Sequence, residues 1–267
     1  SVGREIKAKN PDKIIFCYWM AFMAPCFGTI ARFAKSAKTK SIALVHNMIP
    51  HEPTILDKLF PAYFVKAMDG FVAMTASVVS DINKFDNKYK PKLVSPHPIY
   101  DHYGAITPRS EALDALDLDP AFRYILFFGF IRKYKGLDLL MEAFADIRLR
   151  RFPVKLLVAG EFYEPKEPCY EMIKKHTLED LVVLHTDFIP EKEVAFYFNA
   201  ADLVAQPYRS ATQSGVSQIA YHFEKPMLVT NVGGLAETVP DGKVGYVVES
   251  EVSKIADALV DFFEKNR

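Results

Sequence analysis

Residues 124–144 read YILFFGFIRKYKGLDLLMEAF. The apolar run 124–128 predicts a buried strand, and the spacing of apolar residues over 137–148 predicts a helix. Between them, GFIRKYKG holds three cations between two glycines. Such a loop suits phosphate binding, because positive charge, open backbone N–H groups and the positive end of a helix dipole converge there. A solvated basic turn is the alternative interpretation.

The rest of the chain repeats the same alternation of short apolar runs and helical patterns, which is typical of parallel βαβ units and predicts the α/β class. Helices are expected near 28–37, 55–67 and 77–84 in the first part of the chain and over 217–223 and 252–265 in the second. The further expected strands are 13–18, 41–46, 70–74 and 92–95, then 155–159, 182–185, 203–206, 227–230 and 245–248.

Residues 97–120 contain Pro98, Pro108 and Pro120 together with Gly104. This composition opposes regular structure and predicts an interdomain hinge. The expected domains are 1–103 and 104–267, two Rossmann-like doubly wound sheets facing across a cleft, the first of them incomplete. Open parallel sheets bind ligands beyond the carboxyl ends of their strands, so the site is expected in the loops at those ends.

Two more loops follow predicted strands. Residues 206–216, QPYRSATQSGV, are small and polar, and Gly215 would let a phosphate approach the backbone. Two anion sites in one domain suggest a diphosphate. Residues 231–237, NVGGLAE, end in Glu237, which either favours a helix dipole or contacts the ligand.

Composition excludes several classes of protein. Lys and Arg number 33, as do Asp and Glu, so the net charge is zero and no whole-molecule field attracts nucleic acid. Three cysteines without a CxxC pair favour a reducing compartment, so the cytoplasm is the expected location. Residues 14–31 lack charge, but Pro25 and Gly28 argue against a membrane span.

Familiar cofactor and metal motifs are missing from the sequence. No GxGxxG follows a strand and no Walker A loop occurs. His51-Glu52 lacks the second histidine of a zinc helix. Neither a cofactor nor a metal is therefore expected. His51 remains a candidate for lining the cleft.

Several blocks of the second domain carry a family resemblance. FFGFIRKYKGLDLLMEAF, VAGE, ADLVAQPY, EKPMLVTNVGGLAETV and GYVV occur in this order. Together they resemble the carboxyl-terminal domain of family 4 glycosyltransferases of the GT-B fold. The blocks ALVHN, FVAMTASVVSDI and HPIYD agree with the first domain of that family. The resemblance also implies that the chain is incomplete at both ends.

This resemblance implies an activity. A sugar would pass from a nucleotide-diphosphate donor, such as a UDP- or GDP-sugar, to a glycan or lipid-linked acceptor, with retention of configuration and without a metal. Polysaccharide assembly and peripheral contact with the inner membrane face are expected if the acceptor is lipid-linked. Aromatic residues around Trp19 and Phe22 either face such a lipid or fill the core of the first domain.

Individual residues take their expected roles from the resemblance. Lys135 matches a lysine that contacts the donor diphosphate, and His46 matches a histidine facing the transferred sugar. Phe130 replaces the family's arginine, so Arg132 would supply the second cation. The other residues expected to bind the donor are Gly129, Thr212, Gln213, Ser214, Gly215, Val216, Gln218 and Glu237, with Phe188 and Ile189 beside the nucleobase.

One departure concerns the family's Glu-x7-Glu motif, which aligns with Ala211 and Ile219. Neither carboxylate is present, so neutral side chains such as Thr212 and Gln218, or the nearby Glu224, would have to replace them. The absence also favours a rival hypothesis, a catalytically impaired scaffold subunit. A nucleotide-sugar epimerase or a phosphorylase of the same architecture is a third alternative.

Overall fold

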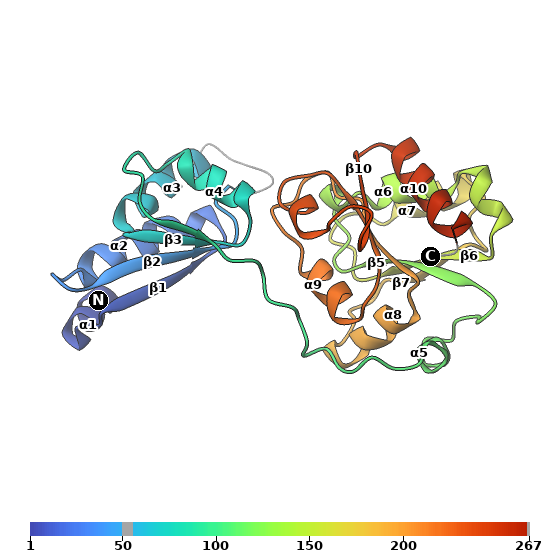
Figure 1. The fold of residues 1–267 in the computed structure, drawn as a ribbon, viewed down its shortest axis with the longest axis horizontal. Helices are drawn as coiled ribbons and strands as arrows, with labels where there is room; N and C mark the ends of the chain where they lie inside the picture. Colours follow the sequence, from blue (N-terminus) through green and yellow to red (C-terminus); the bar gives the residue numbers. More distant parts are fainter. Residues whose placement is uncertain (50–55, 266–267) are drawn as a thin grey trace. The chain divides into compact units, whose positions relative to one another are not determined.

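The computed structural model describes residues 1–49 and 56–265, and the chain forms two compact units, Ser1–His97 and Pro98–Arg267. The sequence placed the boundary after residue 103. Each unit contains a fully parallel sheet, and helices pack against it (Figure 1).

The first unit has a four-stranded sheet in the order β1-β2-β3-β4. Its core contains Phe16, Val45, Phe64 and Phe71, with Tyr18 stacked on Phe64 at a ring distance of 4.5 Å. The elements are α1 (Val2–Lys9), β1 (Lys13–Tyr18), η1 (Ala21–Met23), α2 (Ala24–Ala34), β2 (Lys40–Val45), α3 (Leu56–Ala67), β3 (Gly70–Ala73), α4 (Ala76–Asn83) and β4 (Lys92–Val94).

The second unit has a six-stranded sheet in the order β10-β9-β8-β5-β6-β7. The elements are α5 (Arg109–Ala115), β5 (Arg123–Phe128), η2 (Lys133–Lys135), α6 (Leu137–Phe144), η3 (Ile147–Arg151), β6 (Val154–Ala159), α7 (Glu167–Lys175), β7 (Val182–His185), η4 (Glu191–Glu193), α8 (Val194–Ala200), β8 (Leu203–Gln206), α9 (Gly215–His222), β9 (Met227–Thr230), η5 (Ala236–Thr238), β10 (Gly245–Val248) and α10 (Val252–Glu264).

Alternating side chains bury both faces of this second sheet. Ile125 and Phe127 of β5 pack in one core with α6, α7 and α10, whereas Tyr124 and Leu126 pack in the other with α5, α8 and α9 (Figure 1). The strand therefore reads as a continuous apolar run, as the sequence indicated.

The expectation that residues 97–120 lack regular structure is wrong for α5. Pro108 stands at its N-cap with φ −53°, because a proline is tolerated where a helix begins and no N–H donor is needed. Ala112 and Leu113 of α5 are buried, and Arg109 donates to Asp202 at 3.1 Å. The prolines thus bound a packed helix instead of preventing one.

Other helix boundaries differ from those expected, most of all in α6 and α2. The helix predicted over 137–148 ends at Phe144 and is followed by η3, where Asp146 accepts a bond from the Arg148 N–H at 2.9 Å. α2 begins at Ala24, because Pro25 lies in its first turn, where its missing N–H is not needed. Within the described residues, no helix is both long and apolar enough to span a membrane.

Candidate functional site

The strand order of the second sheet reverses direction between β5 and β8. β5, β6 and β7 follow one another outward on one side, and β8, β9 and β10 do so on the other. In open parallel sheets, ligands bind at such a reversal, so a ligand crevice is expected beyond the carboxyl ends of these two strands. The loop after β5, residues 129–136, and the loop after β8, residues 207–214, flank this crevice.

Glycines allow these loops to pack backbone against backbone. Gly136 has φ +69°, and a Cβ there would overlap the carbonyl oxygen of Pro207. Gly233, in the loop after β9, has φ +48°, and its Cβ would overlap the carbonyl oxygen of Ala211. Only glycine combines this backbone conformation with such an approach. The three strand-end loops therefore form one closely packed layer.

An arginine joins the two central loops. Arg209 donates two bonds to the carboxylate of Asp138, at 2.7 and 2.6 Å, and a third to the carbonyl oxygen of Lys133 at 2.9 Å. Its own N–H donates to the carbonyl oxygen of Tyr134 at 2.7 Å. The Arg209 bonds hold the pKa of Asp138 below its ordinary value even though burial opposes that shift. The charge of Arg209 is thus already compensated.

Lys135 is in the opposite situation. Its side chain is 9% exposed, and among the residues that the structure describes it forms no ion pair. Burial, followed by the charge of Arg132, lowers the pKa of the Lys135 ammonium to about 8. A buried cation without a counter-charge is unfavourable unless a ligand supplies one.

The position of the Lys135 ammonium points to that ligand. Its Nζ lies 3.0 Å from the place where a Cβ of Gly129 would be, and Val216 of α9 lies 4.0 Å from the same point. The ammonium also lies 5.7 Å from the ring of Tyr208, whose hydroxyl is 3.4 Å from Ser214 Oγ. Lys135 and the amino end of α9 therefore meet at the crevice.

Ser214 begins α9 as its N-cap and accepts the Val216 N–H at 3.2 Å. The adjacent Tyr208 is buried, and burial raises the pKa of its hydroxyl, which stays protonated. The positive end of the α9 dipole and the Lys135 ammonium thus face one region, an arrangement that attracts a phosphate.

Arg132, the expected second cation, lies on the surface beside this region. Its guanidinium is 4.9 Å from the ring centroid of Tyr163, and Tyr163 packs against Phe130 with centroids 4.4 Å apart. Phe130, 46% exposed, thus forms an aromatic contact where the resembled family has a cation.

The remaining predicted donor contacts of the loop after β8 and of α9 occupy different environments. Thr212 and Gln213 are half-buried, whereas Gln218 is only 6% exposed in the second turn of α9. The close approach at Gly215 is made by the ring of Tyr100, 3.0 Å from where its Cβ would be.

The structure places the other predicted donor contacts beside neighbouring strands. Phe188 and Ile189 follow β7, which β6 separates from β5, and Phe188 is 68% exposed. Glu237 follows β9, next to β8, and its exposed side chain belongs to the short η5.

The two positions that lack the expected carboxylates face the protein core. Ala211 and Ile219 are both buried in the core on the α8 and α9 face. Glu224 does not replace them: it lies beyond the carboxyl end of α9, with φ +54°, just before β9 starts. The suggestion that Glu224 serves as a nearby carboxylate is therefore wrong, because α9 spans roughly 12 Å and separates it from the crevice.

His46 belongs to the first unit, at the carboxyl end of β2. Its ring lies 6.1 Å from that of His97, and burial, followed by the charge of His97, lowers the pKa of His46. Tyr18 is buried nearby, while Trp19 and Phe22 are exposed. His51 lies outside the described residues. In residues 1–49 and 56–265, no three His, Cys, Asp or Glu side chains form a group that could hold a metal ion.

Sequence reasoning missed the Arg209–Asp138 pair and the contact of the Tyr100 ring with Gly215. One signal for the pair was available: an acid in the first turn of the helix after the basic loop, and a base in the loop after β8. No sequence signal linked Tyr100 to Gly215, because they meet only through the path of the chain.

Comparison with known proteins identifies the family to which the second unit is similar. The family model described as "Glycosyl transferases group 1" matches residues 122–265. The D-inositol 3-phosphate glycosyltransferase of Paenarthrobacter aurescens is 29% identical over 188 residues, covering 61% of this chain and 45% of that protein. A lipopolysaccharide 1,2-N-acetylglucosaminetransferase of Salmonella typhimurium is 28% identical over 163 residues, covering 58% of this chain and 42% of that protein. The chain thus spans less than half the length of these curated relatives.

Solved structures share the fold. Anabaena Alr3699/HepE in complex with UDP superposes with a TM-score of 0.82 at 15% identity, covering 100% of this chain and 73% of that one. Sucrose-phosphate synthase from Thermosynechococcus elongatus gives 0.77 at 17% identity, covering 96% and 65%. These likenesses confirm the predicted GT-B fold with two Rossmann-like sheets. This family model matches residues 122–265, more than half of the chain and the whole of the second sheet. The chain therefore belongs to the group 1 glycosyl transferases.

Proposed function

We propose that the second unit binds the diphosphate of a nucleotide-sugar donor at the crevice between β5 and β8. The observation that carries this proposal is Lys135, a buried ammonium that forms no ion pair within the described part of the chain and lies beside the amino end of α9. A donor diphosphate supplies the missing negative charge. In glycosyl transfer, negative charge builds up on the diphosphate as it leaves the sugar.

In this mechanism Lys135 stabilises the negative charge that grows on the leaving diphosphate. Arg132 adds a second, more exposed positive charge, and the first turn of α9 adds its dipole. The protein is proposed to position the donor and the acceptor, and the transfer is proposed to proceed with retention of configuration and without a covalent nucleophile from the chain. The reaction is proposed to need no metal, with the cations doing the work of charge stabilisation.

UDP is the first nucleotide to consider. Anabaena Alr3699/HepE, a structural neighbour, was solved with UDP and with UDP-glucose. We place the base beside Phe188 and Ile189, where the exposed Phe188 ring offers a face for stacking. His46 is proposed to face the transferred sugar.

The acceptor is proposed to be a glycan or a lipid-linked glycan. One relative is named a D-inositol 3-phosphate glycosyltransferase, and another is named a lipopolysaccharide 1,2-N-acetylglucosaminetransferase. A lipid-linked acceptor would bring the protein to the cytoplasmic face of the inner membrane as a peripheral protein.

A binding-only subunit is the second candidate function. It is favoured by Ala211 and Ile219, whose buried apolar side chains leave both positions of the acidic motif without a carboxylate. Product analysis separates the two: formation of a glycosylated product from UDP-glucose and an acceptor supports the enzyme, and UDP binding without turnover supports the subunit.

Donor binding is tested by thermal unfolding of the chain with UDP, GDP, ADP and CMP. A nucleotide at about 100 times its Kd stabilises the native state by roughly 2.7 kcal/mol, a shift of several degrees. We expect one nucleotide, UDP, to produce the shift in the wild type and none in Lys135→Ala. An equal shift in both proteins would exclude Lys135 from the site.

A further inference from the structure

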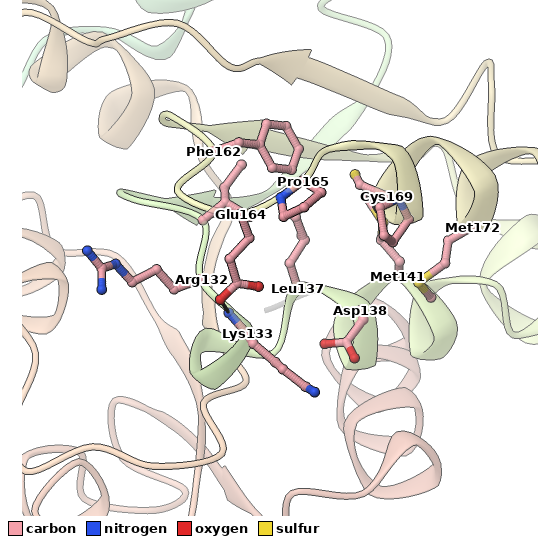
Figure 2. Close-up of a pocket in the computed structure, with 12 residues that line it drawn as sticks. Arg132, Lys133, Leu137, Asp138, Met141, Phe162, Glu164, Pro165, Cys169 and Met172 are labelled. Atoms are coloured by element: carbon pink, nitrogen blue, oxygen red, sulfur yellow. Dashed lines mark hydrogen bonds between the residues drawn. The ribbon is translucent and has the colours of Figure 1, made fainter. Parts of the chain in front are cut away.

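A pocket lies beside the loop after β5, on the face of the sheet covered by α6 and α7 (Figure 2). Its volume of about 350 Å³ falls in the range of small-molecule sites. α6 contributes Leu137 and Met141, α7 contributes Cys169 and Met172, and the loop after β6 contributes Phe162. Lys135 and Ser214 do not line it, whereas Arg132, the second cation proposed for the donor, does.

The pocket is polar at one end and apolar at the other. Figure 2 shows Arg132, Lys133 and Glu164 toward one end, and the sulfur atoms of Met141, Cys169 and Met172 toward the other. The Cys169 Sγ lies 3.8 Å from Met141 Sδ, and burial raises the pKa of this thiol to about 11, so the sulfur end is uncharged.

The charges at the polar end are unevenly compensated. The carboxylate of Asp138 accepts both bonds from Arg209, and a carboxylate oxygen of Glu164 accepts the backbone N–H of Lys133 at 2.7 Å. Neither Arg132 nor Lys133 pairs with a carboxylate anywhere in the described part of the chain. Glu164 keeps its own negative charge, because a backbone N–H is neutral. With Asp138 paired to Arg209, two positive charges and one negative charge remain at the rim, so its net charge is positive.

We infer that this pocket binds an amphipathic anion, a hydrocarbon chain that ends in a phosphate or carboxylate. The hydrocarbon chain occupies the sulfur-lined end, and the anionic head lies at the rim, within reach of the Lys133 ammonium and away from the Glu164 carboxylate. At roughly 30 Å³ for each water-sized group, the pocket holds about a dozen non-hydrogen atoms, the size of an eight-carbon chain with its head group.

This site goes beyond the proposed donor site but shares a wall with it. Arg132 and Lys133 line the pocket, and Lys133 begins η2, whose last residue is Lys135. An occupant of the pocket therefore contacts the turn that presents the Lys135 ammonium. Binding at the pocket itself does not depend on donor binding, so each can fail without the other.

The test uses octyl phosphate below its critical micelle concentration and the chain labelled with ¹³C at its methionine methyl groups. Met141 and Met172 line the pocket, and the other methionines report on the rest of the fold. We expect saturable shifts of the Met141 and Met172 signals, weaker binding of octanol, and no shift with inorganic phosphate.

Lys133→Ala should weaken octyl phosphate binding about tenfold, the effect of one lost charge-assisted contact, and leave octanol unchanged. Lys254→Ala, an exposed lysine of α10, is the matched control and should bind octyl phosphate like the wild type. Cys169→Trp fills the apolar end and should abolish binding of both compounds.

Three outcomes would overturn the inference. They are an absence of shifts at Met141 and Met172, equal shifts of all methionine signals, and equal weakening by Lys133→Ala and Lys254→Ala. If Cys169→Trp fails to fold, the two lysine variants still decide the matter.

Discussion

The two sheets of this chain are both parallel, yet their strands are ordered differently. In the first unit, β1 to β4 lie side by side in the order of the sequence, so every connection moves the same way. In the second unit the order reverses between β5 and β8. A reversal separates two neighbouring loops and opens a crevice, whereas a one-way order does not. Among the strands that the structure describes, the reversal that marks a switch point therefore lies in the second unit.

The side chains at the strand ends follow the same distinction. At the crevice of the second unit lies Lys135, an ammonium kept charged at neutral pH. At the end of β2 in the first unit lies His46, whose pKa burial lowers, so its ring is neutral at the same pH. The crevice offers a fixed positive charge, and the first unit offers a neutral donor or acceptor of hydrogen bonds.

The largest expected effect comes from removing that charge. Lys135→Met should lower UDP affinity on the order of 10²–10³-fold, because a desolvated charge contact is lost. It should also stabilise the second unit by on the order of 1–3 kcal/mol, since an apolar side chain replaces a buried cation. Calorimetric titration and thermal unfolding measure the two effects.

The size of the stability effect of Lys135 depends on pH. The folded-state pKa of Lys135, about 8, lies below the ordinary lysine value, so the unfolded chain holds more protons between those two values. The Lys135 contribution to stability should therefore rise with pH across that interval, so the stability gained by Lys135→Met over the wild type should shrink as the pH rises. Lys133→Met, an exposed change in the same turn, is the control. If Lys135→Met binds UDP as tightly as the wild type, Lys135 does not contact the diphosphate.

The next effect tests whether the loops of the crevice need their glycines. Gly136→Ala should destabilise the chain by about 2–3 kcal/mol, because it adds a backbone overlap with Pro207 to the strain of a positive φ. Gly242→Ala is a matched control, since Gly242 has nearly the same φ, +70°, with nothing within 4 Å of its Cβ position. It should lose only about 1 kcal/mol. Equal losses in urea unfolding would show that the close approach is unimportant.

A smaller effect should appear in the pH dependence of nucleotide binding. The charged form of Lys135 binds the diphosphate, so affinity should be full below about pH 8 and fall by at most about tenfold per pH unit above it. The nucleotide phosphates are already ionised there, with a pKa of about 6. Titrations of UDP across this range measure the slope. Lys135→Arg, which stays charged, should give a flat profile, and a slope shared by both proteins would assign the titration to another group.

The sequence predicted most of the second sheet because each strand is a short apolar run bounded by polar residues. β7, β8, β9 and β10 begin and end at the expected residues. The Arg209–Asp138 pair had a sequence signal that was missed, whereas the contact of Tyr100 with Gly215 had none, because it joins distant segments only through space. The error at α5 has the same origin, since its buried face needs α8, which lies far along the chain.

The smallest expected effect concerns the first unit. His46 is proposed to face the transferred sugar, and UDP carries no sugar, so His46→Ala should leave UDP affinity within about twofold of the wild type. The same change should lower affinity for UDP-glucose, because a hydrogen bond to the sugar is lost. Titrating both ligands into wild type and variant separates the two contributions. If His46→Ala lowers the affinity for UDP as strongly as the affinity for UDP-glucose, His46 makes no separate contact with the sugar. The contrast between a charged phosphate contact at Lys135 and a neutral sugar contact at His46 would then be wrong.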